Sequence, residues 1–150
     1  MSEKIVKIVD LKAPVAKVWQ AIADHNAFGE WFRVRLDQPF AVGQETTGQM
    51  TTPGFENYPW RSVTDVIEPE RRLVFRWHDC DLKSGVDVAL HPLTTVEFRL
   101  EPGPDGGTRL TITESGFESI AEPRRAEVMR DNTGGWDIQA KQIKAFVDAG

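Results

Sequence analysis

The sequence is poor in cysteine, in long apolar runs and in positive charge, and each shortage excludes a class of protein. Its 150 residues include a single cysteine, Cys80, so no disulfide can form within the chain and a reducing compartment is favoured. No stretch is apolar enough to span a bilayer, and the first residues lack the apolar block of a signal peptide. The formal net charge of -5 disfavours a nucleic-acid partner. We therefore expect one globular domain, residues 1–150, in the cytoplasm, with no membrane span and no nucleic acid.

Two short motifs could suggest cofactor chemistry, and neither has the required context. The stretch "GPDGG", residues 103–107, lies between two strand-like runs rather than before a helix, so it predicts a hairpin turn and not a phosphate loop. In "HDCD", residues 78–81, strand alternation places His78 and Cys80 on one face, which is too few ligands for zinc. The same pair lacks a group that would orient the histidine for nucleophilic catalysis. We expect no metal and no cofactor.

The first third of the chain predicts a strand followed by two short helices. The β-branched run "EKIVKIVDL", residues 3–11, is typical of a strand. Apolar residues at helical spacing then predict a helix that begins near Pro14, a residue tolerated in the first turn. Residues 23–32 predict a second short helix, with Asp24 or Asn26 available as its cap.

From residue 34 to 115 the pattern changes to five strand-like runs separated by turn signals, which indicates an antiparallel meander. In the last hairpin, Val96, Phe98 and Leu100 are expected to oppose Leu110 and Ile112. The order of elements therefore predicts an α+β fold in which a curved sheet grips one long helix. At one end of the helix the two need not touch, and a mostly apolar pocket is expected there.

That long helix is predicted over residues 124–147, and it contains two adjacent glycines. A helix of this length would extend about 36 Å. Each of Gly134 and Gly135 should cost about 1 kcal/mol relative to alanine. Such a cost is tolerated where the backbone must approach another group closely or where the helix bends.

Several blocks of the sequence resemble a known superfamily. The blocks "HNAFGEWF", "PERRLVFRW", "TTVEFRLEP", "GGTRLTITESGF" and "GGWDIQAKQIKAF" look like those of the START-like helix-grip (SRPBCC) superfamily. The most similar branch is the AHSA-like one, which resembles the C-terminal domain of the heat-shock-protein ATPase activator. The resemblance implies a seven-stranded antiparallel sheet around a long C-terminal helix, with a cavity between them. It implies little about reaction, since this fold hosts carriers, cyclases, dehydratases, sensors and co-chaperones.

Glu114 raises a question of its own, because it follows Leu110 and Ile112 on the inward face of the last strand. If the carboxyl group enters an apolar cavity, desolvation raises its pKa and makes it a candidate general acid or base. The alternative is that the strand has left the core by this point, so that Glu114 is solvated or paired with an arginine at the sheet edge.

The candidate ligand-binding residues are mainly aromatic. Trp77 continues the buried row of Leu73 and Phe75, and Trp136 follows the glycine pair on the face toward the sheet. Trp31 and Trp60 are expected at the pocket mouth, or equally at a solvent-side or interface position. For Trp77 and Trp136, ordinary packing is the competing interpretation. The full set of candidates is Trp31, Trp60, Phe75, Trp77, Phe98, Ile112, Glu114, Met129 and Trp136.

Three functional hypotheses follow. The preferred one is binding of a small hydrophobic or amphipathic ligand between sheet and helix. The second is a cyclase or dehydratase that uses Glu114 as acid or base, assisted by His78 or Tyr58. The third is an interaction module that regulates a heat-shock-protein ATPase, as the family resemblance suggests. Aromatic residues near Trp60 also make a homodimer an expectation.

Overall fold

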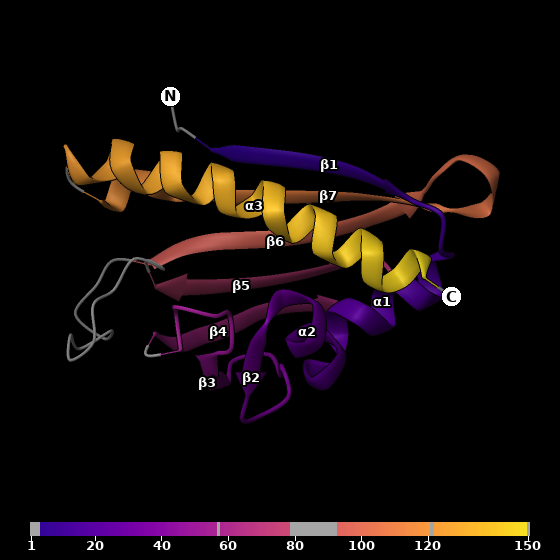
Figure 1. The fold of residues 1–150 in the computed structure, drawn as a ribbon, viewed down its shortest axis with the longest axis horizontal. Helices are drawn as coiled ribbons and strands as arrows, with labels where there is room; N and C mark the ends of the chain where they lie inside the picture. The colour runs from indigo at the N-terminus through magenta and orange to yellow at the C-terminus, as the bar shows by residue number, and fades with distance from the viewer. Residues whose placement is uncertain (1–3, 57, 79–92, 121, 150) are drawn as a thin grey trace.

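The computed structural model describes residues 4–56, 58–78, 93–120 and 122–149 (Figure 1). Asp79, Cys80, Asp81 and His91 lie outside these residues, as does the side chain of His78. The metal and nucleophile interpretations of "HDCD" therefore fall outside the described residues. Among the described residues, no group of three or more metal-ligating side chains converges. No described helix combines the length and the apolar character needed to cross a bilayer.

The described residues form seven strands and three helices, with two short 3-10 helices. The elements in chain order are β1 (Ile5–Leu11), α1 (Val15–Ala23), α2 (His25–Phe32), β2 (Val34–Leu36), β3 (Glu45–Met50), β4 (Pro59–Glu68), β5 (Arg72–His78), β6 (Leu93–Pro102), η2 (Pro104–Gly106), β7 (Thr108–Ser115), η3 (Phe117–Ser119) and α3 (Arg124–Asp148).

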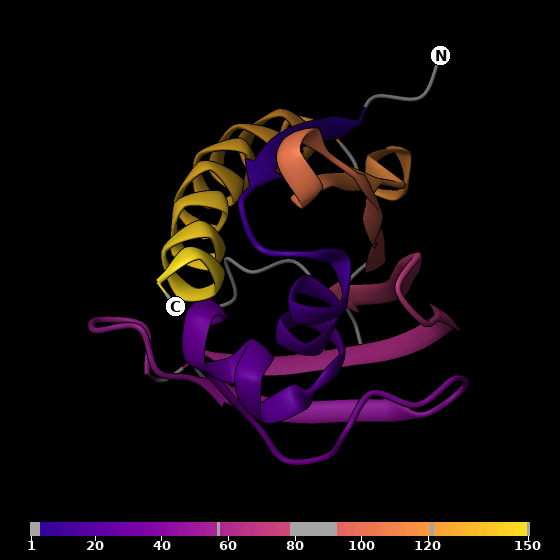
Figure 2. The ribbon, with the colours of Figure 1, turned by 90° about the vertical axis from the view of Figure 1, so that its right-hand side faces the viewer.

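All seven strands form one antiparallel sheet in the order β1-β7-β6-β5-β4-β3-β2. The sheet curves around the helices, so that α1 and α2 lie within the bend and α3 runs along the concave face (Figures 1 and 2). The predicted α+β helix-grip fold is confirmed. The three-residue strand β2 was not predicted from periodicity, because it is too short to show an alternating pattern.

Local signals in the sequence account for several of these elements. Asp24 caps α2, since its carboxylate accepts a hydrogen bond from the backbone N–H of Asn26 at 2.9 Å. The β6–β7 hairpin has the predicted register, with Phe98 opposite Ile112 and Leu100 opposite Leu110. Its turn passes through Asp105 and Gly106, which both have positive φ.

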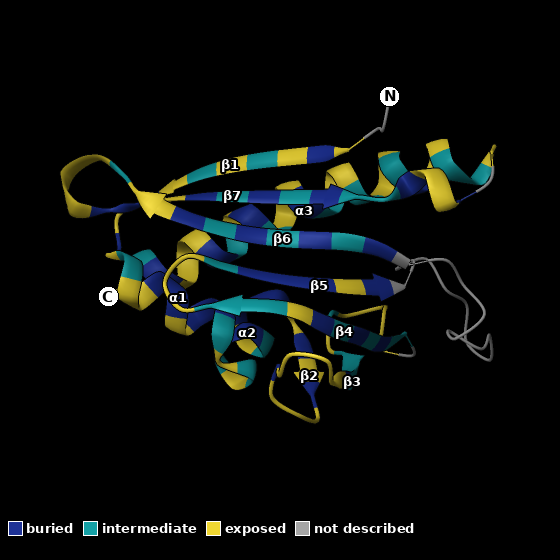
Figure 3. Ribbon diagram, turned by 180° about the vertical axis from the view of Figure 1, so that it is seen from behind, coloured by how far each residue is buried: buried dark blue, intermediate teal, exposed yellow. Residues whose placement is uncertain are grey.

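Burial alternates along the strands, as expected for a sheet with one covered face. Figure 3 shows buried and partly exposed residues alternating along β6 and β7. The covered side is packed with aromatic rings. Phe28 lies within this core, stacked on Phe32 at 5.0 Å and edge-on to Trp31, Phe40, Trp60 and Phe98.

Candidate functional site

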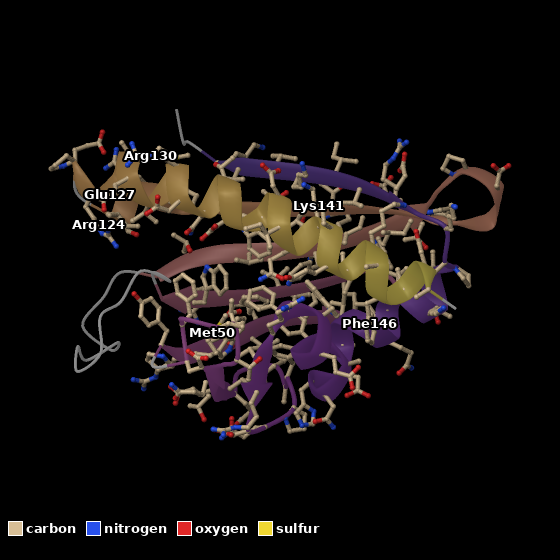
Figure 4. The ribbon with its side chains drawn as sticks, viewed as in Figure 1. Met50, Arg124, Glu127, Arg130, Lys141 and Phe146 are labelled. Carbon is tan, nitrogen blue, oxygen red and sulfur yellow. The ribbon has the colours of Figure 1, made fainter. Side chains whose placement is uncertain are left out.

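A cleft of about 470 Å³ lies along α3, at the end of the molecule where the β3–β4 connection approaches that helix. Figure 4 shows Met50, at the end of β3, beneath α3 on the cleft side. We call this space the α3 cleft. Its lining residues are Phe32, Met50, Phe55, Tyr58, Trp77, Asp131, Asn132, Gly134, Gly135, Trp136, Ile138 and Gln139.

The aromatic lining of the α3 cleft comes from three elements and the β3–β4 connection. Trp77 of β5 and Trp136 of α3 are stacked, with ring centroids 5.5 Å apart and planes inclined by 28°. Phe32, at the end of α2, meets both indoles edge-on at about 6 Å. The two tryptophans are almost fully buried, whereas Phe55 in the β3–β4 connection is 49% exposed. The cleft therefore has a rigid aromatic floor and a more exposed aromatic wall.

Glu114 lies beneath this floor and is completely buried. Its Oε1 accepts hydrogen bonds from Trp136 Nε1 at 2.9 Å and Asn132 Nδ2 at 3.1 Å. Its Oε2 accepts hydrogen bonds from Trp77 Nε1 at 3.0 Å and Thr94 Oγ1 at 2.6 Å. The four donors come from β5, β6 and α3, so this one carboxyl group connects the sheet to the long helix.

The hydrogen bonds of Glu114 answer the question raised by its inward position. Among the described residues, its hydrogen-bond partners all donate to it, as an acceptor-only carboxylate requires. Glu114 is thus neither solvated at the sheet edge nor paired with an arginine, and it is not among the residues that line the cleft. Three of its donors, Trp77, Asn132 and Trp136, do line the cleft. Glu114 therefore orients cleft residues from below, and this geometry does not favour direct proton transfer to a molecule in the cleft.

Gly134 and Gly135 occupy the wall of the cleft formed by α3. The helix is continuous through both residues, so they mark no interruption. Within the described residues, a Cβ atom added at either position would meet no protein atom within 4 Å. The glycines are therefore not explained by a close approach of the described parts of the chain. The two glycines leave open space on the cleft side of the helix.

The structure separates the other candidate residues from the cleft. Trp31 and Trp60 are buried in the core, not at the pocket mouth, and each is only 3% exposed. Their indole N–H groups are satisfied internally, Trp31 by the carbonyl oxygen of Ala21 at 2.8 Å and Trp60 by Ser62 Oγ at 3.0 Å. The remaining candidates pack within the core or against it, and these are Phe75, Phe98, Ile112 and Met129.

Some cleft residues were not identified from the sequence. Asn132 could have been found, because it lies four residues before Trp136 and therefore on the same face of α3. Phe55 and Tyr58 lie in the β3–β4 connection, where no periodicity indicates which way a side chain faces. Their rings contact each other edge-on at 5.4 Å.

The pKa of Asp148, at the opposite end of α3, is shifted by its surroundings. Burial raises the pKa of the Asp148 carboxyl. Lys144 Nζ at 3.0 Å and the backbone N–H groups of Lys12 and Ala13 lower this pKa, and their combined effect is larger than that of burial. The net effect is a pKa below the ordinary value of 3.8. Asp148 thereby ties the end of α3 to the β1–α1 connection.

Residues 12–148 match the family described as "Activator of Hsp90 ATPase homolog 1-like protein" (AHSA1). The chain belongs to the AHSA1 family. Among curated proteins, no match to this AHSA1 chain was found.

Solved structures similar to this AHSA1 chain share its fold at low sequence identity. Protein MLL2253 from Mesorhizobium loti is 22% identical, with a TM-score of 0.76 and 98% of each chain covered. A protein from Arthrobacter aurescens is 19% identical, with a TM-score of 0.79, covering 100% of this chain and 92% of that one. The Aha1 dimer from Colwellia psychrerythraea is 16% identical, with a TM-score of 0.71, and the match covers 99% of this chain and 98% of that one. These similarities establish the fold.

Proposed function

We propose that this protein binds a small hydrophobic or amphipathic molecule in the α3 cleft. The observation that carries the proposal is the glycine pair. Two adjacent glycines in the interior of a helix cost about 1 kcal/mol each, yet no atom of the described residues lies within 4 Å of a Cβ added at either position. Packing by the described residues does not account for the pair, and a bound molecule that lies against the helix backbone would account for it.

The composition and size of the cleft support the same proposal. A volume of about 470 Å³ is within the usual range for small-molecule sites. Its floor is held by buried hydrogen bonds to Glu114, so the indole rings of Trp77 and Trp136 are positioned before any ligand arrives. Phe55 and Ile138 remain 49% and 58% exposed, which is unfavourable for large apolar side chains unless something covers them.

Native mass spectrometry of freshly purified protein tests whether a ligand is retained. Titration with aromatic and aliphatic compounds, followed by tryptophan fluorescence, tests the cleft directly because two of its residues are tryptophans. We expect quenching that is weakened by Phe55→Ala. The matched control is Phe146→Ala, which removes a partly exposed phenylalanine of α3 that does not line the cleft (Figure 4). Equal quenching in both variants would contradict binding at this site.

Two partner hypotheses rest on the family and its members rather than on the cleft. The family description supports a chaperone-regulating role, which is tested by adding the protein to a heat-shock-protein ATPase and measuring hydrolysis. The similar protein from Colwellia psychrerythraea was solved as a dimer, which supports the expected homodimer and is tested by sedimentation. The enzyme hypothesis has less support, because Glu114 lies beneath the cleft with both oxygens engaged.

A further inference from the structure

The polar groups of the α3 cleft differ in whether they already have partners. Asn132 donates its side-chain N–H to Glu114, and Gln139 donates its own to the carbonyl oxygen of Phe32 at 3.2 Å. Asp131 has no ion-pair or hydrogen-bond partner within the described parts of the chain. The carboxylate of Asp131 is therefore a charged group of the cleft that remains available to a ligand.

The charge of the cleft follows from the same residue. Among the described residues that line it, Asp131 carries the one formal charge. The neighbouring Arg130 lies along the upper side of α3 in Figure 4, whereas Met50, which lines the cleft, lies below the helix. An anion in the cleft would face a carboxylate beside apolar walls, which is unfavourable. A cation would gain both that carboxylate and the faces of the aromatic rings.

The spacing along α3 defines the shape of the preferred ligand. Asp131 precedes Gly134 and Gly135 by three and four residues, so the three positions share one face of the helix. Four residues of helix rise about 6 Å. A ring that lies against the glycines and the indole of Trp136 therefore has the carboxylate about one helical turn away.

We infer that the α3 cleft selects flat aromatic molecules that carry a cationic ammonium group about one helical turn from the ring. This inference rests on the proposed function, because it names the ligand class of the same cleft. The ring occupies the space left by the glycine pair, and the ammonium group pairs with Asp131. Arylalkylamines are the simplest compounds with this arrangement.

The test compares three probes of similar size: 2-phenylethylammonium, 3-phenylpropionate and the neutral 3-phenylpropanol. Binding is measured by ligand-observed NMR at low ionic strength, where charge contributes most. We expect the ammonium compound to bind about tenfold more tightly than the carboxylate. In Asp131→Asn this preference should fall to about twofold or less.

Asp137→Asn is the matched control, since it makes the same charge change on α3 but at a residue that pairs with Lys7 and does not line the cleft. It should retain the preference for the ammonium probe. Equal or tighter binding of the carboxylate, or an unchanged preference in Asp131→Asn, overturns the inference while leaving the proposed function intact. Failure of all three probes to bind overturns both.

Discussion

Replacement of the α3 glycines by alanine should stabilise the protein and weaken binding in the cleft. Gly134 and Gly135 have helical backbone conformations, and no protein atom lies within 4 Å of an added Cβ. Alanine is preferred over glycine inside a helix by about 1 kcal/mol, with no clash to offset the gain. For a chain of this size, 1 kcal/mol raises Tm by about 2–4 °C, so the double variant should gain about 4–8 °C.

The same methyl groups would enter the space that we assign to the ligand. Overpacking of a well-fitted contact costs about 1–3 kcal/mol, which corresponds to an affinity loss of roughly fivefold to 150-fold. Stability is measured by urea unfolding followed by circular dichroism, and affinity by tryptophan quenching. We expect the free energy of unfolding to rise and the ligand affinity to fall.

Gly43→Ala is the control for this experiment. Gly43 also has open space around its Cβ position, but its φ is +78°, a conformation unfavourable for alanine. This variant should therefore lose about 1 kcal/mol of stability and keep its affinity. If Gly135→Ala destabilised the protein as Gly43→Ala does, or stabilised it without any effect on binding, the reasoning from the glycine pair would be refuted.

Three further variants test other parts of the structure. Glu114→Gln should lower the free energy of unfolding by about 2–3 kcal/mol, because an amide N–H₂ would face donors, and the near-ultraviolet circular dichroism of the tryptophans should change. Asp148→Ala should cost about 1–2 kcal/mol near pH 7, and Asp148→Asn less, since it retains an acceptor for the backbone. The native pKa of Asp148 is depressed, so this contribution is present above pH 3.8 and is lost as the pH falls through the lower native value. The difference between Asp148→Ala and the parent should accordingly disappear in acid, and a constant difference would contradict the assignment. Phe55→Ala should leave Tm within about 1 °C of the parent, because Phe55 is 49% exposed, while reducing ligand affinity.

Elements with a repeated pattern could be predicted from the sequence. The α+β order, the register of the β6–β7 hairpin and the long C-terminal helix all follow from alternation, turn residues and helical spacing. The strand β2 could not be predicted, because three residues carry too little periodicity and its place depends on pairing with β3. The buried positions of Trp31 and Trp60 could not be predicted either, and the sequence favoured the pocket mouth or a solvent-side or interface position. Sequence spacing does not reveal that acceptors for both indole N–H groups lie within the core.

The sequence by itself determined that Glu114 shares a strand face with Leu110 and Ile112, and that two adjacent glycines lie within an otherwise good helix-forming segment. Both are properties of local periodicity and composition. Only the tertiary structure decided what these features meet, because their neighbours come from β5, β6 and the β3–β4 connection, distant in the chain. Four donors from β5, β6 and α3 surround the carboxyl group, and the space beside the glycines remains open among the described residues.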